Sequence, residues 1–144
     1  GTGEAVVTGV HLLNDKNEVI ELVNVGQPVG LRIAIETKSE LPELVLGYMI
    51  KDRLGQPMFG TNTHHLDQKL KNVPGAQKGA YTFHFPVNLG PGTYSISTAL
   101  HIADTHIGKN YQWKDMALVF NVMNIDKSTF VGTCWLPPRV EYRA

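Results

Sequence analysis

Apolar and polar residues alternate along most of this chain, and this period of two is the feature that most limits its fold. Within residues 29–38, Leu31, Ile33 and Ile35 fall on one face of an extended strand, whereas Arg32 falls on the other. A helix needs apolar residues every three or four positions, and we find no long segment with that spacing. The alternation therefore predicts a chain built from half-buried β-strands.

The same pattern predicts short strands along the whole sequence, separated by turns rich in Gly, Pro, Asn and Asp. They cover 5–13, 19–25, 29–38, 44–51, 58–60, 80–88, 93–103, 111–113, 116–123 and 130–136. Residues 61–78 are the least regular stretch, in which a short helical turn around 66–70 is allowed. Turns spaced roughly 8–12 residues apart between short strands are typical of a two-sheet sandwich.

A glycine-rich corner refines this prediction. Leu89-Gly90-Pro91-Gly92 turns the chain just before Tyr94, which begins the next strand. The arrangement resembles a tyrosine corner, in which the phenol bonds to upstream backbone where the chain crosses between sheets. Strands 80–88 and 93–103 then lie in opposite sheets; the alternative is a plain hairpin with Tyr94 as a core aromatic. We therefore predict an all-β fold, an immunoglobulin-like, two-sheet antiparallel β-sandwich.

Length and charge limit the domain count and the partners. The chain has 144 residues, 42% of them hydrophobic, which is enough for one core, so we predict a single domain over residues 1–144. Its 13 basic and 13 acidic residues cancel. Nucleic acids and anionic membranes attract a surplus of Lys and Arg, so this balance argues against both as partners. No apolar run approaches the roughly 20 residues of a membrane span, and we expect no direct membrane insertion.

The motifs of common enzyme classes are missing from the sequence. There is no glycine-rich phosphate loop and no Gly-x-Ser-x-Gly nucleophile elbow, and the acidic residues stand in no distinctive pair. The single cysteine, Cys134, lies in a predicted strand, where a small, partly buried hydrophobic residue is a simpler interpretation than a nucleophile. One cysteine cannot form an intrachain disulfide, which fits a reducing compartment. We predict that the chain is not an enzyme.

The histidines are the residues that most suggest a metal. His101, Asp104 and His106 cluster near one strand end, and His64 and His65 lie in the irregular stretch. These spacings match none of the strong zinc patterns, which need three or four converging ligands. We therefore predict no metal and no cofactor, and retain a metal-dependent enzyme built on the histidines as the third hypothesis.

The region 101–113 is rich in the residue types that bind sugars. Sugar sites place aromatic faces against C–H groups and surround them with amide, carboxylate and imidazole partners for the hydroxyls. Both tryptophans have core packing as the alternative, but the polar neighbours of Trp113 make it the better exposed candidate. We predict carbohydrate-binding residues, with Arg32 added for an anionic cap: His101, Asp104, His106, Tyr111, Trp113 and Arg32.

The block from Gly47 to Thr63 resembles the C-terminal domain of Wzt, the nucleotide-binding subunit of ABC transporters that export bacterial O-antigen polysaccharide. The shared pattern is a strand ending in Ile-Lys-Asp, a glycine turn and then Phe-Gly-Thr-Asn-Thr, and the later Leu-Gly-Pro-Gly-Thr-Tyr-Ser-Ile corner also fits. The motif residues are interpreted as structural: Gly55 makes the turn, Asn62 caps the strand exit and Phe59 packs. The motif therefore identifies the domain without locating a sugar site.

The resemblance implies an immunoglobulin-like sandwich that binds the exported polymer, typically through its non-reducing end. It implies an excised C-terminal part of a longer transporter subunit, located in the cytoplasm and peripheral to the inner membrane through the transporter. It also implies the ATPase and transmembrane subunits as partners, and a homodimer, with exchange of the last strand between protomers as one arrangement. No ATPase motif is present, so ATPase activity is not carried over.

Two hypotheses lead the functional interpretation. The first is a carbohydrate-binding domain that selects one O-polysaccharide for export without making or breaking a bond. The alternative is a dimerisation or docking module without glycan affinity, in which the apolar segment 130–138 pairs with another strand edge.

Overall fold

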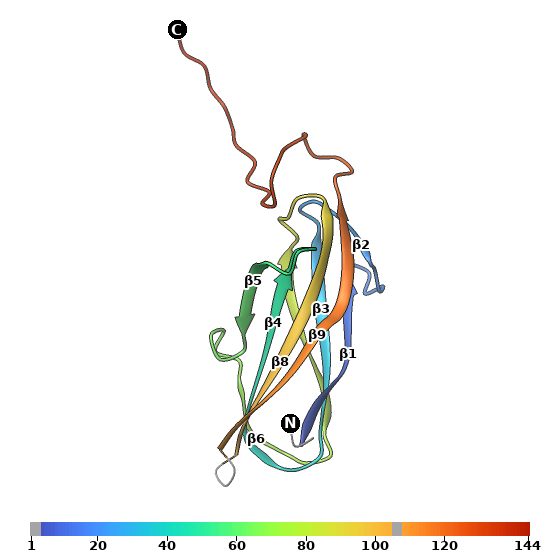
Figure 1. The fold of residues 1–144 in the computed structure, drawn as a ribbon, viewed down its shortest axis with the longest axis vertical. Helices are drawn as coiled ribbons and strands as arrows, with labels where there is room; N and C mark the ends of the chain where they lie inside the picture. Colours follow the sequence, from blue (N-terminus) through green and yellow to red (C-terminus); the bar gives the residue numbers. More distant parts are fainter. Residues whose placement is uncertain (1–3, 105–107) are drawn as a thin grey trace.

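The computed structural model describes residues 4–104 and 108–144, and for 102–104 and 108–111 it describes the backbone only. Its regular elements are strands, and the described part of the chain contains no helix (Figure 1). The strands are β1 (Ala5–Leu13), β2 (Leu22–Asn24), β3 (Pro28–Thr37), β4 (Leu41–Lys51), β5 (Pro57–Asn62), β6 (Leu70–Val73), β7 (Lys78–Pro86), β8 (Gly92–Asp104) and β9 (Gly108–Met123). Because no described segment is helical, none is a helix that could span a membrane.

The strands form two sheets that pack face to face (Figure 1). The smaller sheet has the order β1-β3-β7, and the larger has the order β2-β9-β8-β4-β5, with β6 also paired to β4. All pairs are antiparallel except β2 with β9. The all-β sandwich predicted from the alternation is confirmed.

The core lies between the sheets and takes every second residue of the central strands, as the period of two requires. Leu31 and Ile33 of β3 are fully buried, and so are Leu46 of β4 and Ile96 of β8. The largest fully buried side chain is Phe120 of β9, whose ring stacks on Tyr94 with centroids 5.7 Å apart. The neighbours of these residues point to the outer faces, where a ligand can reach them.

The predicted tyrosine corner is present. The Tyr94 hydroxyl donates a hydrogen bond of 2.7 Å to the backbone carbonyl of Gly90, and burial raises the pKa of this phenol, so it remains a neutral donor. β7 and β8, the strands on either side of the corner, belong to opposite sheets, as predicted. Gly90 is required because a Cβ there would overlap the carbonyl oxygen of Gly132.

The family block forms the hairpin β4–β5. Gly55 has a φ of 82°, the left-handed conformation that favours glycine, and Asp52 accepts backbone N–H bonds from Leu54 and Gln56. Asn62 accepts the backbone N–H of His65 at 2.8 Å, which confirms its predicted role at the strand exit. The predicted packing of Phe59 is only partly right, because 54% of this residue is exposed.

Several strand limits differ from the predictions. In the segment 19–25 only β2 is a regular strand, and it pairs in parallel with β9, whereas Val19 forms one isolated bridge with Leu13. The irregular stretch 61–78 contains β6. The helical turn allowed around 66–70 is absent; residues 63–67 form a turn and Leu70 begins a strand. The predicted strands 111–113 and 116–123 are one strand, β9, interrupted by a bulge in which Met116 has a φ of 48°.

The last predicted strand, 130–136, is also wrong. This segment makes one isolated bridge, from Cys134 to Leu89, and Gly132 adopts a φ of 106° that breaks an extended run. Cys134 is exposed rather than partly buried. The segment is held instead by Trp135, which packs on the core and against the ring of Phe130 at 4.8 Å.

Candidate functional site

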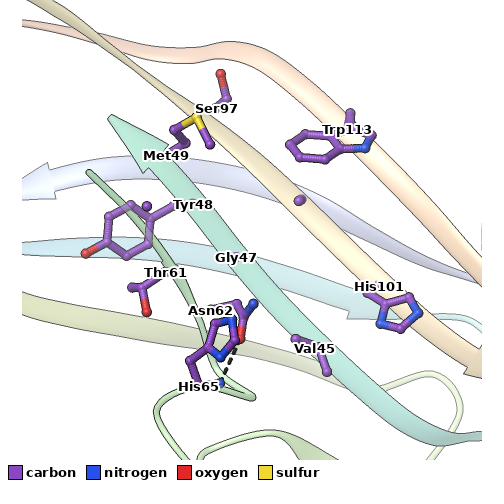
Figure 2. Close-up of a pocket in the computed structure, with 12 residues that line it drawn as sticks. Val45, Gly47, Tyr48, Met49, Thr61, Asn62, His65, Ser97, His101 and Trp113 are labelled. Atoms are coloured by element: carbon purple, nitrogen blue, oxygen red, sulfur yellow. Dashed lines mark hydrogen bonds between the residues drawn. The ribbon is translucent and has the colours of Figure 1, made fainter. Parts of the chain in front are cut away.

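A groove of about 430 Å³ lies on the outer face of the larger sheet (Figure 2). Its lining comes from β4, β5, β8 and β9 and the turn after β5: Val45, Gly47, Tyr48, Met49, Gly60, Thr61, Asn62, His65, Ser97, Ala99, His101 and Trp113. On β4 and β8 most of these residues alternate with core residues, so they point away from the core. The volume falls within the range of roughly 300–1,000 Å³ usual for small-ligand sites.

Small residues form the floor of the groove. Gly47 of β4 lies directly opposite Ala99 of β8, and Gly60 of β5 lies opposite Met49. A Cβ added at Gly47 would come within 3.2 Å of the side chain of Asn62 and the carbonyl of Thr61. Any larger residue at this position would therefore crowd the floor. With glycine there, a flat ligand can approach the backbone closely.

Trp113 forms one side of the groove. It lies on β9 directly opposite Ala99, and 63% of it is exposed. Figure 2 shows its ring standing beside β8, across from Asn62 and His65 on the β5 side. A large aromatic residue in this position contributes little to the core and offers an apolar face to a ligand.

Polar groups stand around this aromatic face. Asn62 uses its side-chain oxygen to accept the backbone N–H of His65, which orients the amide group at the groove. His65 and His101 place imidazoles in the lining, and Ser97 adds a hydroxyl. Amide, imidazole and hydroxyl groups are hydrogen-bonding partners that orient a ligand rich in hydroxyl groups.

The charge near the groove is balanced. The Ser97 hydroxyl donates to Asp115 at 3.0 Å and the Lys51 ammonium group lies 3.3 Å from the same oxygen, and these two hydrogen bonds lower the pKa of Asp115. Asp115 therefore stays ionised at neutral pH with Lys51 as its counterion. Among the described residues that line the groove, none is Asp, Glu, Lys or Arg, so the cavity suits an uncharged ligand.

The structure brings together part of the predicted sugar-binding set. His101 and Trp113 both line the groove. Tyr111 lies opposite His101 in the β8–β9 register and Asp104 ends β8, but their side chains lie outside the described residues, as does the whole of His106. Arg32 lies elsewhere: it is exposed on β3 of the smaller sheet, opposite His11 and Thr82.

Other lining residues were not predicted from the sequence. Gly47 and Asn62 belong to the family block and were interpreted as structural, yet both also shape the groove. The sequence suggests His65 only as a metal ligand. The predicted β4–β5 hairpin is the sequence feature that could have identified these residues. Its pairing of Gly47 with Asn62 places the two residues on one face, beside Ala99.

Among the side chains that the structure describes, no three of His, Cys, Asp or Glu come close enough to hold a metal ion. The neighbouring rings of His64 and His65 are 5.9 Å apart, but no third ligand among the described side chains joins them. The groups available to a ligand in the groove are therefore aromatic, amide, imidazole and hydroxyl groups.

Comparisons with known proteins agree with this architecture. The family model described as "Wzt C-terminal domain" matches residues 1–136. A solved structure described as "Crystal structure of the C-terminal domain of wzt" superposes with a TM-score of 0.83 at 18% sequence identity, covering 99% of this chain and 86% of that chain. At this identity the superposition shows a shared fold. Among curated proteins, none matches the sequence.

Proposed function

The chain belongs to the Wzt C-terminal domain family, and from this premise we propose that it binds a specific O-antigen polysaccharide and selects it for export by an ABC transporter. The observation that carries the proposal is Trp113, exposed beside a groove floored by Gly47 and Ala99. Binding alone accounts for this role, and the domain makes or breaks no bond. Its proposed place is the cytoplasmic side of the inner membrane, with the ATPase and transmembrane subunits as partners.

The groove has the features that a sugar needs. The Trp113 ring offers its face to the C–H groups of a pyranose, and the small floor lets the opposite face of the sugar lie close to β4 and β8. Asn62, His65 and His101 are placed to bond the hydroxyls. A glycan that lacks a matching hydroxyl leaves these groups unpaired, which is the most effective source of selectivity in such a site.

We propose that the non-reducing end of the polymer occupies the groove. This end carries the finished terminus of the glycan, so reading it would separate complete polymers from incomplete ones. Arg32 does not line the groove, because it lies on β3 in the other sheet. If Arg32 binds an anionic cap, as predicted, it does so at a site separate from the groove.

Calorimetry with the O-polysaccharide of the source bacterium tests the proposal. We expect saturable binding of the intact polymer and weaker binding after its non-reducing terminal sugar is removed, because polar groups of the groove are then left unpaired. A polysaccharide of unrelated repeat structure is the control. Equal affinity for both polymers, or no heat with either, would contradict selection of a specific glycan.

The C-terminal segment supports a second candidate function, dimerisation. After β9 the chain folds back on the end of the sandwich, where Phe130 and Trp135 pack, and its last part then runs away from the sandwich (Figure 1). Four apolar side chains beyond Phe130 face solvent, with Val131 95%, Leu136 80%, Val140 89% and Tyr142 89% exposed. In the described structure residues 137–144 pair with no strand, and such a segment is suited to pairing with the edge of a second copy, including by exchange.

We expect truncation before Phe130 to convert a dimer into a monomer, because it removes this whole segment. Light scattering measures the change directly. A second truncation after Leu136 keeps the Leu89–Cys134 bridge and the Trp135 packing, and so separates the contribution of residues 137–144. A dimer that survives the longer truncation would count against the segment as the interface.

A further inference from the structure

A second cavity opens at the edge of the sandwich, between β5 of the larger sheet and β7 of the smaller one. Both are the last strands of their sheets, and none of the described strands covers this edge. The cavity has a volume of about 500 Å³. It is lined by Tyr48, Phe59, Thr61, Thr63, Leu66, Gln68, Tyr81, Thr82, Phe83, His84 and Phe85, and we call it the edge cleft.

Aromatic rings in mutual contact form the wall of the edge cleft. The ring of Tyr48 lies 4.8 Å from that of Phe83, 6.0 Å from Phe85 and 6.2 Å from Phe59, between centroids. Tyr81 continues the row, 6.1 Å from Phe83. The three β7 rings remain only half-buried although they face inward, so the row presents aromatic surface to solvent.

Polar groups border these rings. The Tyr81 hydroxyl donates to the backbone carbonyl of Gln68 at 2.5 Å and so ties the loop after β5 to β7. Thr61, Thr82 and His84 add hydroxyl and imidazole groups to the lining. Among the described lining residues of the cleft, none carries a fixed charge, as in the groove. This combination suits an uncharged ligand with apolar faces and hydroxyl edges, rather than a purely apolar one.

The edge cleft and the groove share one wall. Tyr48 and Thr61 line both cavities. Along β5 the lining residues alternate, because Gly60 and Asn62 contribute to the groove whereas Phe59 contributes to the cleft. The two cavities are therefore neighbours on opposite faces of a single edge strand, and a polymer held in one can continue around β5 into the other.

We propose that the edge cleft is a second saccharide-binding subsite, which holds a further sugar of the same polymer whose end occupies the groove. The inference rests on the proposed glycan-binding function. It makes two specific demands. Affinity must increase once the glycan is long enough to pass around β5, and the gain must depend on the aromatic row.

Substitution of Phe59→Ala tests both demands. Phe59 lines the cleft but not the groove, and at 54% exposure its loss leaves the core in place. We expect the affinity for long fragments of the source bacterium's O-polysaccharide to fall about tenfold, the effect of losing one well-placed aromatic contact. Short fragments that fill only the groove should bind the variant and the original chain equally. Titration calorimetry across a ladder of fragment lengths measures both.

Leu54→Ala is the matched control, because Leu54 lies in the turn of the same β4–β5 hairpin and lines neither cavity. Amide chemical shifts give a readout independent of any variant: long fragments should move the signals of Tyr81 and Phe83, and short ones should not. If Trp113→Ala removes binding but Phe59→Ala leaves every fragment unaffected and these signals stay still, the edge cleft is not a subsite although the groove is. If the original chain binds no fragment, the proposed function fails and this inference fails with it.

Discussion

Replacing Trp113 with alanine is expected to lower the affinity for the O-polysaccharide about thirtyfold or more while the domain stays folded. Central aromatic residues in binding sites commonly contribute more than about 2 kcal/mol, and each 1.4 kcal/mol is about tenfold in affinity. The fold should tolerate the change because Trp113 is 63% exposed on the outer face of β9. Calorimetry measures the binding, and thermal unfolding shows that the variant is folded.

Two further variants make this result specific. Met123→Ala removes another exposed apolar side chain from the same strand, outside the groove, and should leave the affinity unchanged. Trp113→Tyr keeps an aromatic face and should restore part of the binding that alanine loses. Unchanged affinity in Trp113→Ala would remove this residue from the site and with it the main support for the groove.

The fold could be predicted because the alternation is a local property of the sequence. The limits of β1 follow from it directly, and Tyr94 correctly placed β7 and β8 in different sheets. The failures occur where tertiary contacts decide. The segment 130–136 alternates like a strand, but its backbone pairs only at Cys134, since Gly132 turns the chain out of an extended conformation. Alternation predicts extended backbone but cannot say whether a neighbouring strand is present to pair with it.

The groove could be predicted only in part. The sequence predicts Trp113 and His101 because their residue types suit sugar and the neighbours of Trp113 are polar, and both line the groove. Gly47, Asn62 and His65 were missed because they reach the groove through the pairing of β4 with β5 and β8, which depends on register. From the sequence alone, a glycine in a strand is interpreted as a packing or turn residue, because the residue opposite it on the neighbouring strand is not known.

Register also explains why one hairpin can serve two cavities. β5 is an edge strand, so both of its faces remain near solvent, and its alternate residues face the groove and the edge cleft. The family block therefore has a structural role in the Gly55 turn and a proposed binding role along β5. The structural role can be predicted from the sequence. The proposed binding role can be inferred only once the positions of β4 and β7 beside β5 are known.

Replacing Phe120 with alanine is expected to have the largest effect on stability. Phe120 is 1% exposed and stacks on Tyr94, which anchors the corner between the sheets. Truncating a buried phenylalanine typically costs about 3–5 kcal/mol, a large part of the roughly 5–15 kcal/mol that holds a domain folded. Urea unfolding should show a lower midpoint with little change in slope, because the surface exposed on unfolding stays nearly the same.

Val119→Ala is the matched control, since Val119 precedes Phe120 on β9 and points to the opposite face, where it is 40% exposed. We expect its effect to stay within about 1 kcal/mol, because Val119 is only partly removed from water and the change deletes two methyl groups rather than a buried ring. The contrast between two adjacent residues tests the period of two on which the fold prediction rests. Similar losses for both variants would mean that the two faces of β9 are buried alike, and the outer face would then not be free to hold a glycan beside Trp113.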